Sequence, residues 1–303
     1  MSDLVVRTCA KVNFCLRVLG RRSDGYHEVE TVLHTIGLWD RLHLSPLPGE
    51  PRIALKVDVH EAPADESNLC WQAARLLSQR VNTPVGVSIE LEKSIPAAAG
   101  LGGGSSDAAA TLAGLARMWR LDLEPGELEE LGAEIGADVP FFLRGGCCLA
   151  LGRGEKLKAL SHINAWLVVV VPERRVPTGQ AYAALGRGTA RGRRRGLTRA
   201  IQRTVKACTE AEPATVAKAL HNDFEVLAMA GVAEAREAKA ALLQAGCLGA
   251  GLSGSGSAVF GIAPHRAAAE DIAAQLQSRW SWIKVAPTVP SGQSLLLEDA
   301  AER

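Results

Sequence analysis

The sequence predicts an α+β protein in two parts, and three observations carry that prediction. An alternating apolar segment at 85–91 is followed by a glycine-rich loop and then by apolar residues at helical spacing. A second apolar run, AWLVVVV at 165–171, has the length of a buried strand and is too short to span a bilayer. With 303 residues, the chain is long enough for two domains that each bury a core. We therefore expect an N-terminal domain of residues 1–160 and a C-terminal domain of residues 161–303.

The first part alternates strands with helices. We expect strands at 4–6 continuing into 12–19, and at 42–45, 53–59 and 85–91, with helices at 68–79, 105–119 and 125–135. Val85, Val87 and Ile89 point to one face of their strand because successive side chains alternate. In the helix after the glycine loop, Leu112 and Leu115 recur at helical spacing, and Ser105 or Ser106 can cap its start.

The second part begins with a strand and then carries most of its helices. The pattern predicts strands at 166–171, 258–262 and 282–289, and helices at 215–227, 232–244 and 267–280. No repeat is evident.

Composition excludes several classes of function. Lys and Arg number 34 against 33 acidic residues, a net charge of +1, so the whole molecule is not built to attract nucleic acid or an anionic membrane. The seven cysteines form no CxxC pair and no Cys/His cluster, which argues against a zinc site or a disulfide framework. The sequence begins without the basic-then-apolar layout of a signal peptide. We expect a cytoplasmic protein with no nucleic-acid or membrane partner.

One segment departs from this even charge balance, GRGTARGRRRGLTR at 186–199. It could bind a polyanion or form a basic flap near an anionic substrate. We favour a solvated loop, because isolated charge runs are usually loops or tails. No aromatic residue is interleaved that could stack on bases.

The glycine loop PAAAGLGGGSSDAAA, at 96–110, lies between a strand and a helix. That arrangement presents free backbone N–H groups and a helix N-terminus to an anion. No lysine follows the glycines as in a P-loop, and Ser105 occupies the third glycine position of a dinucleotide fingerprint. We predict a phosphate cradle in which Ser105 and Ser106 add donors or hold a metal; the alternative is a structural turn. Asp107 would complement the helix dipole, or face Mg²⁺ or a neighbouring cation.

Two further motifs supply charged groups. AKVNF places Lys11 and Asn13 on the same face of an early strand, although such a pair is often only an exposed face. GADVPFF places Asp138 just after a helix that Gly136 can end, where a turn-forming role is the alternative. A second glycine cluster, GAGLSGSGSAVFG at 249–261, could close over the same anion from the other domain.

Together these motifs resemble the GHMP kinase superfamily. PAAAGLGGGSSDAAA is similar to its phosphate-loop motif and GLSGSGSAVF to its third motif, and the resemblance runs from about residue 8 to the final strand. AKVNFCLRVLGRRSDGYHEVETV and GADVPFFLRGG resemble the branch that phosphorylates a cytidine diphosphate-linked methylerythritol. The resemblance implies a deep cleft between an N-terminal ribosomal-protein-S5-like domain and a C-terminal ferredoxin-like domain. It also implies ATP and Mg²⁺ as the phosphoryl donor.

The resemblance assigns roles to individual positions. Lys11 and Asp138 match the catalytic pair, with Lys11 hydrogen-bonded to the carboxylate; Asp138 acts either as general base or as a positioning group for the substrate hydroxyl. The substrate side matches Asn13, Tyr26, His27, Thr178 and Tyr182, with Tyr182 stacked on the cytosine. The ATP side matches Asn68, Lys93, Pro96, Ala97, Ala98, Ala99, Gly100, Leu101, Gly102, Gly103, Gly104, Ser105 and Ser106. Ser106 is the hydroxyl we expect nearest the metal.

One position departs from the resemblance. Leu33 stands where the family often has a second aromatic residue against the base, so a leucine is expected to cover that face of the cytosine with weaker packing. The expected activity is phosphorylation of the 2-hydroxyl of the cytidylated substrate in the non-mevalonate isoprenoid pathway, by a chain that could form a homodimer. The alternatives are a kinase of homoserine, mevalonate or a sugar, a non-catalytic nucleotide sensor, and an RNA-binding protein that uses the arginine-rich segment.

Overall fold

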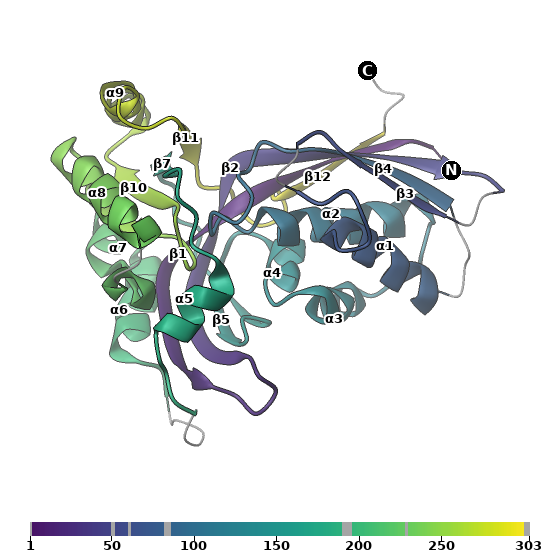
Figure 1. Cartoon of the computed structure of the whole chain (residues 1–303), viewed down its shortest axis with the longest axis horizontal. Helices are drawn as coiled ribbons and strands as arrows, with labels where there is room; N and C mark the ends of the chain where they lie inside the picture. Colours follow the sequence, from purple (N-terminus) through teal and green to yellow (C-terminus); the bar gives the residue numbers. More distant parts are fainter. Residues whose placement is uncertain are drawn as a thin grey trace.

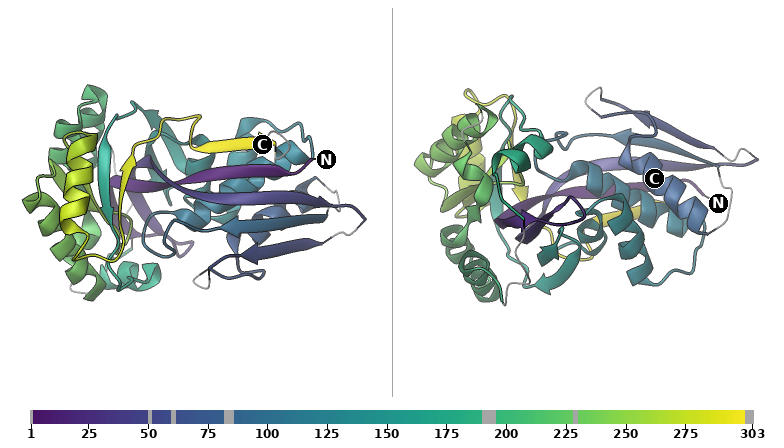
Figure 2. Two further views of the ribbon diagram at one scale, coloured as in Figure 1. Left: turned by 90° about the horizontal axis from the view of Figure 1, so that it is seen from above. Right: turned by 60° about the horizontal axis from the view of Figure 1, so that its bottom comes forward.

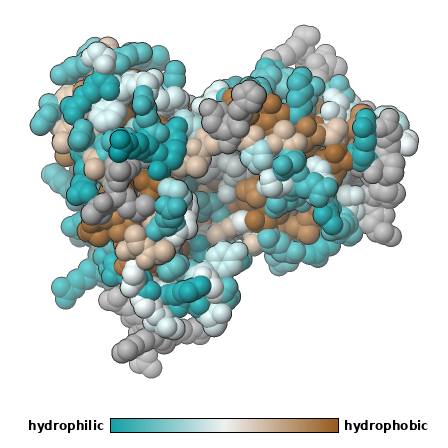
Figure 3. Space-filling view, viewed as in Figure 1, coloured by the Kyte–Doolittle hydropathy of each residue, from teal (hydrophilic) through white to brown (hydrophobic). Residues whose placement is uncertain are grey.

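The computed structural model describes residues 2–49, 52–59, 62–81, 86–189, 196–227 and 230–299. Two lobes lie side by side along the long axis, and the two longest strands run from one lobe toward the other (Figure 1). The surface is notched between the lobes (Figure 3). Both lobes combine helices with a sheet, as predicted for an α+β protein. None of the helices in the described ranges is both long and apolar enough to cross a membrane.

The first sheet has a long hairpin at its centre. β1 (Leu4–Arg21) and β2 (His27–Leu47) pair antiparallel over nearly their whole length. Among the described residues this sheet has eight strands, in the order β12–β1–β2–β4–β3, with β5 and β6 continuing from β2 and β8 pairing with β1. The remaining members are β3 (Ile53–Val57), β4 (Gly86–Glu92), β5 (Cys147–Gly152), β6 (Lys156–Leu160), β8 (His221–Asn222) and β12 (Leu295–Asp299).

The helices of the first lobe pack around α2. They are α1 (Leu69–Arg80), α2 (Gly103–Met118), α3 (Pro125–Ile135) and α4 (Val139–Arg144). Small side chains at Ala108, Ala109 and Ala110 are buried and let α2 pack closely on the sheet. The core between them includes Leu44 and Ile89 from the strands. This packing fixes the N-terminal end of α2 against β1.

The second lobe contains a four-stranded antiparallel sheet in the order β11–β7–β10–β9. Its strands are β7 (Trp166–Val170), β9 (Gly249–Leu252), β10 (Val259–Ala263) and β11 (Ile283–Pro287). Its helices are α5 (Thr178–Ala184), α6 (Arg199–Glu210), α7 (Pro213–Ala219), the 3₁₀ helix η1 (Asp223–Val226), α8 (Ala230–Gln244) and α9 (Arg266–Leu276). Helices α8 and α9 cover the face turned away from the first lobe (Figure 2). β7 is apolar throughout because both its faces are buried: Val168 and Val170 pack toward α8 and α9, and Leu167 and Val169 toward β1.

The structure departs from the expected elements in several places. The predicted strands at 4–6 and 12–19 are one strand, and the strand predicted at 42–45 is the end of the much longer β2. The elements that were not predicted are α4, α5, α6, β5, β6, β8, β9 and β12. The helix predicted at 215–227 is confirmed only to Ala219, the end of α7; after it, His221 and Asn222 pair with β1, and Asn222 caps η1. Val85, the first residue of a predicted strand, lies outside the described residues, as do residues 190–195 of the arginine-rich segment.

The last strand returns to the first sheet. β12 pairs antiparallel with the first residues of β1, from Leu4 opposite Asp299 to Thr8 opposite Leu295. A segment of the predicted C-terminal domain therefore completes the N-terminal sheet. The division at residues 160 and 161 stays a prediction.

Candidate active site

Two adjoining cavities lie where the lobes meet. The first, of about 430 Å³, is lined by the glycine loop, β1 and the second glycine cluster. The second, of about 760 Å³, lies beside α5 and the turn that joins β1 to β2. Ser105, Asp138, Arg153, Thr178 and Tyr182 line both. The shared lining makes them two compartments of one site, which we call the loop cavity and the α5 cavity.

The glycine loop lines the loop cavity with backbone that has no internal partner. Among the described residues, no N–H group from 97 to 102 donates to another backbone or side-chain atom. Gly103, Gly104 and Ser105 form the first turn of α2, where N–H groups have no acceptor within the helix. A row of free donors at a helix N-terminus is a site for an anion.

Two glycines of this loop stand where a side chain would not fit. Gly102 has φ +75°, and a Cβ atom there would lie 2.7 Å from Cζ of Phe142 and 3.0 Å from Cγ of Lys11. A Cβ atom at Gly100 would collide with the carbonyl oxygen of Ser253. The loop is therefore held between the two lobes by close backbone contacts that only glycine permits.

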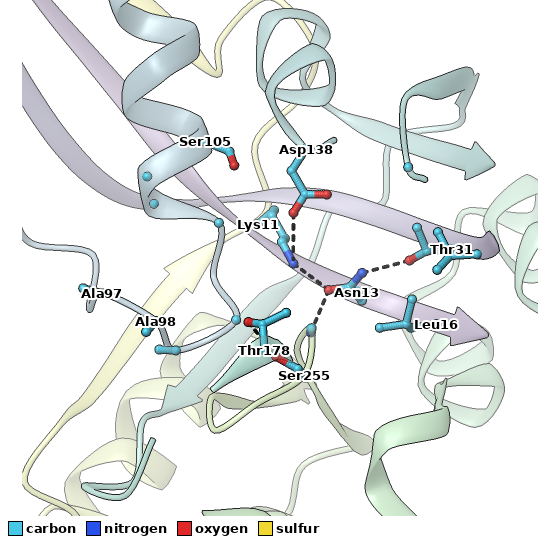
Figure 4. Close-up of a pocket in the computed structure, with 18 of the residues that line it drawn as sticks. Lys11, Asn13, Leu16, Thr31, Ala97, Ala98, Ser105, Asp138, Thr178 and Ser255 are labelled. Atoms are coloured by element: carbon cyan, nitrogen blue, oxygen red, sulfur yellow. Dashed lines mark hydrogen bonds and ion pairs between the residues drawn. The ribbon is translucent and has the colours of Figure 1, made fainter. Parts of the chain in front are cut away.

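Lys11 and Asp138 meet at the mouth of this loop (Figure 4). Lys11 Nζ lies 3.8 Å from Asp138 Oδ2, an ion pair, and donates a hydrogen bond of 2.8 Å to Asn13 Oδ1. The expected hydrogen bond between Lys11 and Asp138 is therefore wrong: at this distance the pair is electrostatic, and Asn13 takes the hydrogen bond instead. Asp138 precedes α4, but its side chain caps no N–H group of that helix and is 36% exposed in the cavity. Its carboxylate is free to face a substrate.

Burial changes the chemistry of Lys11. Its side chain is only 5% exposed, and removal from water lowers its pKa, while the nearby Asp138 carboxylate opposes that shift. Asn13 Nδ2 in turn donates to Thr31 Oγ1 at 2.8 Å, and Thr31 donates to the carbonyl of Cys15. This chain of hydrogen bonds fixes the direction of the ammonium group.

The second glycine cluster closes the loop cavity from the other lobe, as its sequence suggested. Gly254 N donates to Asn13 Oδ1 at 2.8 Å, and Ser253 Oγ donates to the carbonyl of Gly100 at 2.8 Å. Ser255 lines the cavity and its Oγ is 3.2 Å from Thr178 Oγ1. Residues from both lobes thus surround the same space (Figure 4).

Aromatic side chains gather in the α5 cavity. The rings of His27 and Tyr182 lie 4.8 Å apart at 32°, and Tyr182 also meets Phe224 edge-on at 4.8 Å. Burial raises the pKa of Tyr182, so its hydroxyl is neutral. Burial, together with the neighbouring Arg21, lowers the pKa of His27. Neutral rings of this kind suit a flat heterocycle.

Several predicted site residues lie outside the two cavities. Leu33, a residue of β2, is fully buried in the core of the first lobe, so the expectation that it covers a face of the base is wrong. Asn68 caps α1, accepting from Cys70 N at 2.8 Å. Leu101 points into the core, and its carbonyl accepts from Lys11 N at 2.9 Å. Ser106 is fully buried, and its hydroxyl donates to the carbonyl of Cys9 at 2.6 Å. Of the adjacent serines Ser105 and Ser106, Ser105 is the one that lines both cavities.

Lys93 lies beneath the start of α2 in a buried cluster with two carboxylates. Its Nζ is 2.7 Å from Asp107 Oδ2 and also contacts Asp40 Oδ2. Asp40 Oδ1 accepts from the backbone N–H groups of Ser94 and Ile95 at 2.6 and 2.8 Å. Desolvation raises the pKa of Asp107, although Lys93 opposes that shift. Of the three roles expected for Asp107, the structure shows the ion pair with a neighbouring cation, Lys93. The cluster anchors the segment that leads into the glycine loop.

The sequence did not single out Arg153, which lines both cavities. In the sequence, the one feature that marks Arg153 is the glycine on either side of it, in LGRGEK. Arg187, from the start of the arginine-rich segment, also lines the α5 cavity, 3.3 Å from Asp223. That position favours the basic-flap interpretation over a solvated loop for this residue.

Comparison with known proteins gives two family matches. The model for the GHMP kinases N terminal domain matches residues 68–146, and the model for the GHMP kinases C terminal domain matches residues 200–281. A 4-diphosphocytidyl-2-C-methyl-D-erythritol kinase of Bacillus cereus (strain B4264) is 49% identical over 183 residues, which are 60% of this chain and 63% of the relative. The aligned segment thus spans less than two thirds of that relative.

Solved structures match over more of the chain. A crystal structure of 4-(cytidine 5'-diphospho)-2C-methyl-D-erythritol kinase is 35% identical, with a TM-score of 0.76, over 95% of this chain and 100% of that one. A homoserine kinase from Cytophaga hutchinsonii has a TM-score of 0.73 at 19% identity, over 98% of each chain, a likeness of fold alone.

Proposed function

This chain belongs to the GHMP kinase family, and from that premise we propose that it transfers the γ-phosphoryl group of ATP to the 2-hydroxyl of 4-diphosphocytidyl-2-C-methyl-D-erythritol. The observation that carries the proposal is the meeting of Lys11 and Asp138 at the mouth of a loop whose N–H groups have no internal partner. The relatives named for that activity support the choice of substrate.

In the proposed reaction the free N–H groups of the glycine loop hold the phosphates of ATP in the loop cavity. The acceptor hydroxyl lies beside Asp138, which receives its proton as the oxygen attacks the γ-phosphorus. The Lys11 ammonium neutralises charge on the transferred group and attracts the Asp138 carboxylate, 3.8 Å away. Because the transition state of phosphoryl transfer is loose, Asp138 contributes as much by positioning the hydroxyl as by removing its proton.

The donor set of the loop cavity fits Mg²⁺ rather than a softer metal. Its side-chain oxygens come from hydroxyl, amide and carboxylate groups, among them those of Ser105 and Asp138. No cluster of three or more His, Cys, Asp or Glu side chains occurs in the described ranges. Mg²⁺ is commonly held by one or two protein oxygens together with substrate phosphates. We propose Ser105 in place of Ser106 for the protein contact. When bound, Mg²⁺ offsets the charge of the β- and γ-phosphates.

The α5 cavity supports a cytidylated acceptor over a smaller alcohol. His27 and Tyr182 offer aromatic faces there, and Tyr26 lines the rim. Homoserine, mevalonate and simple sugars have no aromatic ring that would stack on this pair. A cytoplasmic location and a homodimer stay predictions of the sequence.

An ADP-release assay with several acceptors tests the proposal. The purified full chain, with ATP and Mg²⁺, is given the cytidylated methylerythritol, homoserine, mevalonate or galactose at equal concentrations. We expect ADP release with the cytidylated acceptor and background rates with the others. A higher kcat/KM for any of the other three would replace this function with that kinase activity.

A further inference from the structure

We propose that Arg153 binds the diphosphate of the acceptor substrate and so sets the specificity of the site for a nucleoside diphosphate over a nucleoside. The proposal rests on the function proposed above. It begins from position: of the residues that line both cavities, Arg153 alone is cationic. An acceptor with its base beside Tyr182 and its hydroxyl beside Asp138 lies along the junction that Arg153 also lines. The group between base and alcohol in that acceptor is a diphosphate.

The local backbone holds Arg153 at this junction. It occupies the turn between β5 and β6, flanked by Gly152 at φ +78° and Gly154 at φ +123°. Its N–H group donates to Glu155 Oε2 at 2.6 Å. A Cβ atom at Gly154 would lie 3.6 Å from Oδ1 of Asp138, so the turn packs directly beside the proposed catalytic carboxylate.

The guanidinium is oriented and forms no ion pair within the described residues, although the Asp24 carboxylate, which Arg22 already binds, is close enough to attract it. Its Cζ lies 4.7 Å from the centroid of the Tyr26 ring, and Nη2 donates to the carbonyl of Ala133 at 3.2 Å. Over the part of the chain that the structure describes, Arg153 has no ion pair with a carboxylate. A guanidinium has five N–H donors, so most of those of Arg153 remain for a ligand. Arginine binds phosphate oxygens through two parallel hydrogen bonds.

The charge around the α5 cavity suits an anion. Among its lining residues, Arg21, Arg153 and Arg187 are cationic, whereas Asp138 is the one carboxylate. Asp223 already neutralises Arg187 at 3.3 Å. Arg153 lies deeper than Arg21, because it also lines the loop cavity. This arrangement makes Arg153 the principal cation available to the acceptor.

Arg153 is assigned to the acceptor rather than to ATP because of the ring it covers. Tyr26 lines only the α5 cavity, and the guanidinium lies over that ring. The donor phosphates have their own partners in the free N–H groups between residues 97 and 105.

The test compares a ligand that has the diphosphate with one that lacks it. Binding of cytidine diphosphate and of cytidine to the full chain is measured by titration calorimetry for the wild type, Arg153→Gln and Arg153→Lys. The matched control is Arg75→Gln, since Arg75 also lies over an aromatic ring, Trp71 at 5.4 Å, but lines neither cavity. Steady-state KM values for ATP and for the cytidylated substrate are measured alongside.

We expect Arg153→Gln to raise the Kd for cytidine diphosphate about 10- to 100-fold, as the loss of a charge-assisted hydrogen bond implies, and to leave the Kd for cytidine within about 2-fold. In Arg153→Gln we also expect a higher KM for the cytidylated substrate and an unchanged KM for ATP. For Arg153→Lys we expect a Kd for cytidine diphosphate between those of the wild type and Arg153→Gln. Arg75→Gln should have the same Kd and KM values as the wild type. An unchanged Kd for cytidine diphosphate overturns the proposal, and so does an equal loss of cytidine affinity or a selective rise in KM for ATP. If the wild type neither binds cytidine diphosphate nor turns over the cytidylated substrate, the proposed function itself fails and this proposal with it.

Discussion

Replacing Gly102 with alanine tests whether the glycine loop is held by the contacts described above. The left-handed conformation at φ +75° costs a residue with a Cβ atom about 1–2 kcal/mol. The new Cβ atom would lie 2.7 Å from Cζ of Phe142, a fully buried ring, and such overpacking costs about 1–3 kcal/mol. The less flexible unfolded chain returns up to about 1 kcal/mol. We therefore expect Gly102→Ala to lower the free energy of unfolding by about 1 to 5 kcal/mol.

Gly104→Ala is the matched control, two residues further along. Its Cβ atom would meet nothing nearer than Leu69 Cδ1 at 3.7 Å, an ordinary contact. Alanine is favoured over glycine in a helix by about 0.5–1 kcal/mol, so this variant should be as stable as the wild type or slightly more stable. Urea unfolding of both variants measures the difference, and ADP release reports whether the displaced Lys11 side chain slows the reaction. A Gly102→Ala variant as stable as Gly104→Ala would refute the steric account of the loop.

The other predictions address catalysis, substrate binding and stability. Asp138→Asn should lower kcat by about 10²- to 10⁴-fold and leave KM for ATP nearly unchanged; a normal kcat in the ADP-release assay would remove Asp138 from its role. Tyr182→Ala should raise KM for the cytidylated substrate roughly 10-fold and spare KM for ATP, and an unaffected substrate KM would dismiss stacking on the base. His34 is fully buried, and burial lowers its pKa from 6.5 to about 3, while its Nε2 accepts from Ile163 N at 3.2 Å. The unfolded chain therefore binds a proton at this site first as the pH falls, so the free energy of unfolding should drop by about 1.4 kcal/mol per pH unit between about 6.5 and 3. His34→Gln should show a shallower decline over that range in urea titrations, and parallel curves for both proteins would contradict the assignment.

Much of the site followed from the sequence because its chemistry lies in short continuous motifs. The glycine loop, the strand that carries Lys11 and the loop that carries Asp138 each have a local pattern that predicts their type. Their meeting at one point was implied only by the family resemblance, since Lys11 and Asp138 belong to segments far apart in the chain.

The errors have a different physical origin. Ser105 and Ser106 are adjacent, and on a helix one residue turns a side chain by about 100°, so composition could not decide which hydroxyl faces the cavity. Lys93 directly follows a strand, a position where an exposed lysine is common, so the sequence did not indicate that it is buried. Its partners Asp40 and Asp107 lie elsewhere in the sequence and are identified only by the fold. Arg153 was missed because a lone arginine in a turn has no pattern until its neighbours in space are known.

The return of β12 to the first sheet affects how the protein is made. β1, which carries Lys11, leaves the ribosome long before β12, yet its first residues, Leu4–Thr8, pair on one edge with residues 295–299. Until that late segment emerges, Leu4–Thr8 presents unpaired N–H and C=O groups along an apolar strand, the kind of edge on which chains associate wrongly. Completion of the first sheet during synthesis therefore waits for residues that are translated long after Lys11.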